Sequence, residues 1–67
     1  MKQTETASIN NTTLTVLIEW SEIEKKANID YFINGYQVTE WNKIKPLFQS
    51  ILTAIADDLC YGYQLIK

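Results

Sequence analysis

The chain has 67 residues, eight acidic side chains, six lysines, no arginine and no histidine, and its formal net charge is −2. The missing histidine removes the commonest general acid–base and metal ligand, and the missing arginine removes the side chain that most often holds phosphate and guanine. We therefore expect a protein that is not an enzyme and binds no cofactor or metal, and nucleic acid is disfavoured as its partner.

A single cysteine favours a reducing compartment. The longest apolar run, around residues 14–18, is far too short to span a bilayer. We therefore expect a cytoplasmic protein with no membrane contact.

The small size of the chain predicts a need for additional stabilisation. A single core in a domain of this length rarely supplies more than about 3–5 kcal/mol. One cysteine excludes a disulfide within the chain, so association is the remaining source of stability. We expect a homodimer, or a permanent complex with another protein.

The amino-terminal residues 1–11 are polar and show no periodicity. This composition is typical of a flexible tail, so we predict a tail over residues 1–11 and a single α+β domain over residues 12–67. Within residues 12–20, apolar side chains alternate with mostly polar ones, which predicts a strand. Residues 21–28 carry a Ser21–Glu24 capping-box pattern and form either one helical turn or a loop.

The dipeptide Asn34-Gly35 predicts a β-hairpin over residues 29–40, because a two-residue type I′ turn requires positive φ at both positions. This turn places Ile33 opposite Tyr36 and Phe32 opposite Gln37. One side of the hairpin then belongs under a helix and contains Ile29, Tyr31, Ile33, Tyr36 and Val38. The other side contains Asp30, Phe32, Gln37 and Thr39.

Residues 40–60 carry large apolar side chains at helical spacing. The predicted stripe consists of Trp41, Ile44, Phe48, Ile51, Ile55 and Leu59, widened by Leu47, Leu52, Ala54 and Ala56. Pro46 allows two paths: a separate turn before a helix that starts at Pro46, or a kinked continuous helix from about residue 40 with Thr39 as N-cap. The unbroken stripe favours a continuous path, either kinked or in two pieces. Gly62 is placed to end the helix, and residues 63–66 could add a short strand.

The predicted fold class is α+β: a three-stranded antiparallel β-meander packed on one long helix in the C-terminal half, β-β-β-α, with a short fourth strand as an option. The helix covers one sheet face and leaves the other open. We predict a binding site on that open face, formed by Thr15, Leu17, Phe32 and Gln37 together with Tyr61 and Tyr63. Alternatively, the amino-terminal tail or residues 21–28 cover Phe32. An unprotected sheet edge could also pair with a second copy.

The remaining reactive side chains give little indication of a catalytic or metal-binding site. Cys60 has no second cysteine or histidine near it in sequence, so we expect a core residue. Asp57 and Asp58 are adjacent, so on a helix they point about 100° apart, and a solvated helix end suits them better than a metal site.

Together these features favour a protein-binding module that acts as an inhibitor or adaptor on a larger complex, of the kind that phages and mobile elements encode against host defence. One alternative is a nucleic-acid accessory protein that uses Lys25, Lys26, Lys43 and Lys45 with exposed aromatic rings. Another is a structural subunit of a larger assembly.

Overall fold

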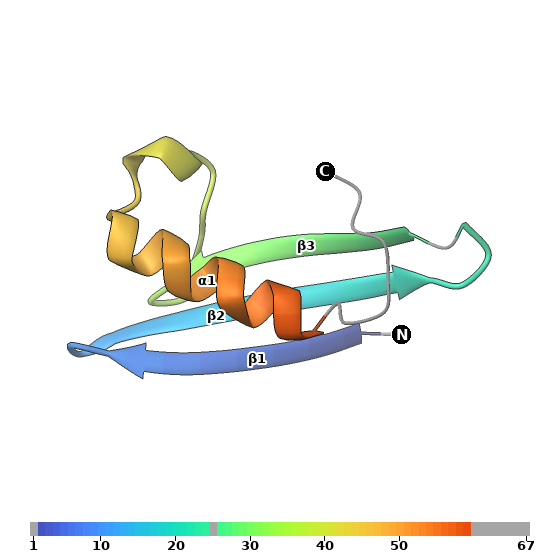
Figure 1. Cartoon of the computed structure of the whole chain (residues 1–67), viewed down its shortest axis with the longest axis horizontal. Helices are drawn as coiled ribbons and strands as arrows, with labels where there is room; N and C mark the ends of the chain where they lie inside the picture. Colours follow the sequence, from blue (N-terminus) through green and yellow to red (C-terminus); the bar gives the residue numbers. More distant parts are fainter. Residues whose placement is uncertain (1, 25, 60–67) are drawn as a thin grey trace.

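A computed structural model describes residues 2–24 and 26–59. It contains one antiparallel sheet with strand order β1-β2-β3-β4, and one α-helix that lies across the front of β2 (Figure 1). The elements are β1 (Lys2–Ile9), β2 (Thr12–Ser21), β3 (Lys26–Ile33), β4 (Tyr36–Gln37), the 3₁₀ helix η1 (Trp41–Lys43) and α1 (Pro46–Leu59). The predicted α+β class, a β-meander packed on a helix in the C-terminal half, is confirmed.

The amino-terminal strand β1 differs from the tail expected over residues 1–11. It pairs with β2 along its whole length, from Lys2 opposite Glu19 to Ile9 opposite Thr12. The connecting residues Asn10 and Asn11 have φ values of 49° and 63°, and asparagine tolerates this left-handed region better than most residues. An edge strand needs few apolar side chains, so its polar composition lacked the apolar alternation that identified β2. The meander therefore has four strands.

The second strand agrees with its prediction, and the segment after it is a turn. Ser21 Oγ accepts a hydrogen bond from the backbone N–H of Glu24 at 3.4 Å. Of the two alternatives for residues 21–28, the structure shows the loop, and β3 already begins at Lys26. A short connection of this kind keeps β2 and β3 in register from Ser21 opposite Lys26 to Leu14 opposite Ile33.

The predicted hairpin turn is present. Asn34 has φ 52° and Gly35 has φ 85°, and the pairs Phe32–Gln37 and Ile33–Tyr36 match the predicted register. The turn is anchored to β2 because Asn34 Oδ1 accepts a hydrogen bond from the Thr13 N–H at 2.9 Å.

Tyr36 does not lie under the helix, contrary to the prediction. Its side chain is 79% exposed, because β4 is the outermost strand and α1 lies over β2, two strands away (Figure 1). The option of a further strand over residues 63–66 and the helix end at Gly62 lie outside the described residues.

The segment from residue 40 forms two pieces, and the single kinked helix is wrong. η1 is a separate turn, and α1 starts at Pro46, where proline is well tolerated because the first helical N–H has no partner within the helix. The residue before η1 is Glu40, without a side-chain cap, so Thr39 is not the N-cap. Trp41 instead packs its ring against Tyr31 at 4.8 Å between centroids, and its carbonyl accepts a hydrogen bond from Gln49 Nε2 at 2.6 Å.

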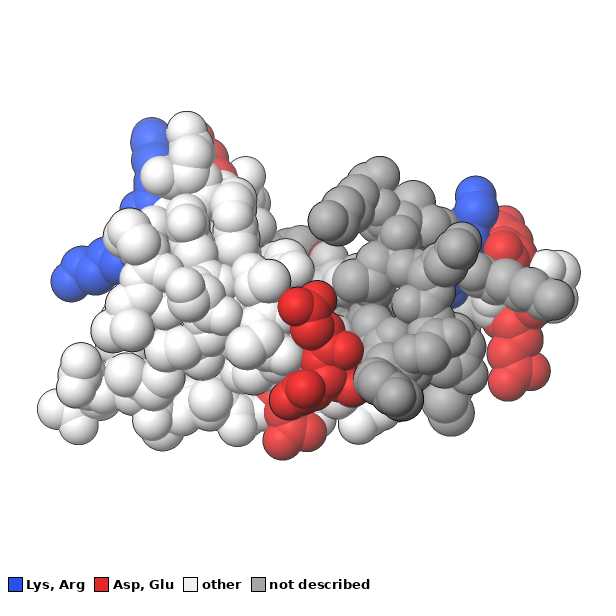
Figure 2. All heavy atoms as spheres, in the orientation of Figure 1, with Lys and Arg blue, Asp and Glu red and all other residues white. Residues whose placement is uncertain are grey.

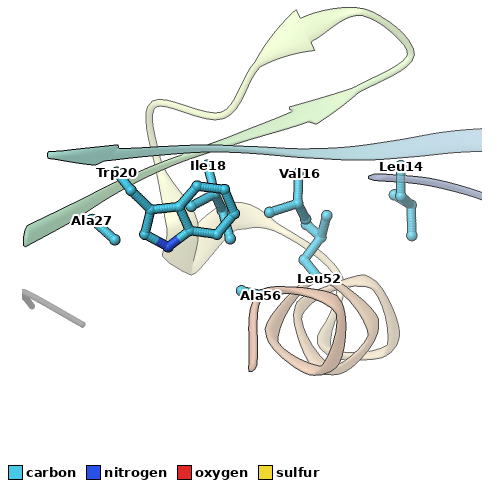
Figure 3. Close-up of a cluster of buried hydrophobic side chains, with 7 residues drawn as sticks. All are labelled: Leu14, Val16, Ile18, Trp20, Ala27, Leu52 and Ala56. Carbon is cyan, nitrogen blue, oxygen red and sulfur yellow. The ribbon is translucent and has the colours of Figure 1, made fainter. Parts of the chain in front are cut away.

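The core lies between α1 and the covered side of β2 (Figure 3). Its buried residues are Leu14, Val16, Ile18 and Trp20 of β2, Ala27 of β3, and Leu52 and Ala56 of α1. The centre of the helix stripe is thus Leu52 and Ala56, which the sequence placed at its margin. Residues of the predicted stripe flank them as partly buried neighbours, namely Phe48, Ile51, Ile55 and Leu59. Leu47 is 54% exposed.

Candidate functional site

The sheet surface that points away from α1, here called the open face, follows from the strand register. Leu14, Val16 and Ile18 point into the core, so the residues between them point the other way, together with their partners on neighbouring strands. Hydroxyl side chains are the commonest kind among them. The open face contains Lys2, Thr4, Thr6 and Ser8 of β1, Thr13, Thr15, Leu17 and Glu19 of β2, Asn28, Asp30 and Phe32 of β3, and Gln37 of β4.

The centre of the open face is apolar. Phe32 lies opposite Thr15, and two residues further along the same strands Leu17 lies opposite Asp30. Leu17 and Phe32 are therefore diagonal neighbours on one face, close enough for their side chains to touch. Both side chains are partly buried. At the rim, Gln37 Nε2 donates a hydrogen bond to Asp30 Oδ1 at 3.3 Å.

The predicted residues Thr15, Leu17, Phe32 and Gln37 share one face, as strand alternation indicated. Thr39 follows β4 in a segment without regular structure. Tyr61 and Tyr63 lie outside the described residues.

Sequence reasoning missed the contribution of β1 to the open face, namely Thr4, Thr6 and Ser8. The signal for it was present. Hydroxyl residues alternate through residues 4–8, and two asparagines then precede the next strand.

Neither segment that was expected to cover Phe32 does so in the described part of the chain. β1 extends the sheet beside β2 instead of crossing its face. The turn over residues 22–24 precedes Lys26, six residues from Phe32 along β3, a separation of about 20 Å in an extended strand.

Two grooves flank α1 on the other side of the sheet. The larger, about 810 Å³, is here called the β3 groove, and its lining includes Ala27, Ile29 and Tyr31 of β3, Trp41, and Ala56 and Asp57 of α1. The smaller, about 460 Å³, is here called the β1 groove and is lined by Gln3, Glu5, Thr6, Ala7, Ile55, Asp58 and Leu59. The neighbours Asp57 and Asp58 therefore line different grooves.

The lysines do not gather into one cationic surface in the described residues. Lys26 starts β3, while Lys43 lies in η1, and Figure 2 shows lysine side chains at both ends of the long axis. Lys43 Nζ forms an exposed ion pair with Glu40 Oε2 at 2.6 Å. Lys25 lies outside the described residues.

Among residues 2–24 and 26–59, no three histidine, cysteine, aspartate or glutamate side chains lie close enough to hold a metal ion. No helix in that part of the chain is both long and apolar enough to cross a membrane. The sequence matches no protein-family model, and neither a curated protein nor a solved structure matches it significantly.

Proposed function

We propose that this protein is a non-enzymatic binding module that contacts another protein through the open face. The observation that carries the proposal is the apolar pair Leu17–Phe32 at the centre of a sheet face opposite the helix. Both residues keep part of their surface accessible. An apolar centre with a polar rim is the usual composition of a modest protein interface.

The rim suits this role because its side chains are short. Thr6 and Thr15 lie opposite each other, and Ser8 lies opposite Thr13. β-branched threonine has few rotamers and loses little side-chain entropy when a partner covers it. Its hydroxyl donates and accepts hydrogen bonds. A partner can thus dock on the part of this face formed by Thr6, Ser8, Thr13 and Thr15 without ordering long, flexible side chains.

In this proposal the module acts as a cytoplasmic inhibitor or adaptor on a larger protein complex, of the type that phages and mobile elements encode. The support for that role is its small size together with a sequence that has no histidine and no arginine. An inhibitor of this kind acts by occupying a surface, so it needs no chemistry of its own.

A homodimer is a second candidate, favoured by the exposed strand β1. β1 is eight residues long, forms one edge of the sheet and carries no proline, and its two charged residues, Lys2 and Glu5, both lie in its first half. Natural edge strands are usually shortened, bulged or charged to prevent pairing with another chain. Two β1 strands could pair across a two-fold axis and join two sheets.

Photo-crosslinking in cells that naturally make the protein tests the open face. A photoreactive amino acid replaces Thr15 on that face or, as a matched control, Ser50, which is exposed on α1 and lines neither groove beside the sheet. We expect a protein adduct from position 15 that disappears when Phe32→Ser is added. Equal adducts from both positions, or an adduct that survives Phe32→Ser, would contradict the proposal. An adduct with twice the mass of the chain would identify the second copy as the partner.

A further inference from the structure

The outer edge of β3 is largely open in the described part of the chain. β4 pairs with β3 only at Phe32 and Ile33, so no described strand lies beside Lys26–Asp30 on that side. These five residues extend about 17 Å. They contain no proline, and their two charged residues, Lys26 and Asp30, lie at the ends, so residues 27–29 carry neither a charge nor a proline to protect the edge.

The backbone groups that point outward can be assigned from one hydrogen bond. The N–H of Val38, just after β4, donates to the Tyr31 carbonyl at 2.8 Å, so Tyr31 directs its carbonyl away from β2. Backbone direction alternates along a strand. Ala27 and Ile29 therefore direct their N–H and C=O groups outward, where an added strand would meet them. Asn28 and Asp30 face β2 instead.

The side chains on either side of this edge differ in character. Ala27 and Ile29 lie on the helix side, where they line the β3 groove together with Trp41. Asn28 and Asp30 lie on the open face. An added strand would thus place alternate side chains into a partly apolar groove and onto a polar, acidic surface.

Carboxylates occur on both sides of the edge. Asp30 belongs to the open face and also lines the groove, together with Glu19 and Asp57, and the described lining contains no lysine. Figure 2 shows acidic side chains gathered beside the C-terminal end of α1. Positive side chains on a partner would complement this charge.

We propose that the edge at Lys26–Asp30 binds an extended peptide segment of a partner protein, with alternating apolar and basic side chains, as an additional antiparallel strand. The apolar side chains enter the β3 groove, and the basic ones lie beside Asp30. Main-chain hydrogen bonds to Ala27 and Ile29 supply the affinity, and the alternation supplies the specificity. This site shares Asp30 with the open face but uses none of Thr15, Leu17 and Phe32, so either proposal can fail without the other.

The β1 edge is a weaker fit for the same peptide. It is longer, but the apolar part of its adjacent groove comes mainly from α1, because Ala7 is the only apolar β1 residue that lines it. β1 also begins with Lys2, which would repel a basic segment. It therefore serves as an internal control.

The test uses the full chain and the synthetic peptide acetyl-Lys-Val-Lys-Val-Thr-amide, followed by amide chemical shifts and hydrogen exchange in NMR. We expect shifts and slower exchange at Ala27 and Ile29, whose amides point outward, with little change along β1. N-methylation of both valines removes the N–H groups that face β3 and should weaken binding at least about fivefold. N-methylation of both lysines alters N–H groups that face solvent, so that peptide should still bind.

A matched pair of protein variants tests the charge. Asp30→Asn keeps the oxygen that accepts from Gln37 but removes the charge, and should weaken binding roughly two- to fivefold. Glu5→Gln makes the same change on β1 and should leave affinity unchanged. The proposal is overturned if about 1 mM peptide causes no shifts at residues 27–30, if β1 responds instead, or if the valine-methylated peptide binds equally well.

Discussion

The two faces of β2 are built from alternate residues of the same ten-residue strand, yet their environments differ sharply. Leu14, Val16 and Ile18 are completely buried under α1. Thr13 and Glu19, on the other side, are exposed, and Leu17 between them is only partly buried. The contrast shows that a single helix is enough to bury one side of the central strand, while the other side of that strand keeps an apolar residue that no described element fully covers.

The largest effect is expected from removing a buried side chain between α1 and β2. Leu52 is fully buried on α1, so Leu52→Ala should destabilise the fold by about 2–5 kcal/mol through lost burial and a residual cavity. Urea unfolding followed by circular dichroism measures the change. Leu47→Ala, at a position that is 54% exposed, is the control and should cost less than about 1 kcal/mol. Similar costs for both would mean that α1 packs through another stripe.

Adjacent substitutions on β2 compare the two faces directly. Val16→Thr keeps the side-chain shape but buries a hydroxyl under the helix, which should cost about 1–3 kcal/mol. Leu17→Thr places the same residue on the open face, where threonine is already common, and should cost less than about 1 kcal/mol. Thermal and urea unfolding of both variants provide the comparison. A large cost at Leu17 would show that something covers the open face.

A smaller effect is expected from a substitution in the β3–β4 turn, which determines the register of that hairpin. Gly35 has φ 85° and no atom within 4 Å of the position of an added Cβ, so Gly35→Ala tests backbone conformation without a clash. We expect a loss of about 1–2 kcal/mol. Asn11→Gly, in the turn before β2 at φ 63°, relieves the same constraint and should not destabilise the fold. A neutral Gly35→Ala would indicate that the hairpin register does not depend on its turn.

The features predicted correctly from the sequence are those that short local patterns determine. Alternation identified β2, and Asn34-Gly35 set the pairing of Phe32 with Gln37, which together placed four predicted site residues on one face. These signals depend on neighbours within a few residues. They contain no information about which strand lies beside another.

The parts that were missed depend on tertiary contacts. Trp41 matched the helical spacing, but its ring packs on Tyr31 of β3, a contact that no local pattern shows. β1 forms without an apolar pattern in its sequence, because it is held by backbone hydrogen bonds to β2. The position of the sheet below α1 likewise determines which helix residues lie at the centre of the apolar stripe. Leu52 faces β2 most directly and is the most buried residue of that helix.

The strands of the sheet are synthesised before the helix that covers them. All sheet neighbours are consecutive in sequence, and hairpins of this type close within microseconds. The helix that covers β2 comes after all four strands, with Leu52 lying 15 residues after Gln37, the last residue of β4. At about 5–20 residues per second a ribosome needs roughly 1–3 s for that stretch. During that interval the strands are complete, and the helix that buries their apolar side chains is still being made.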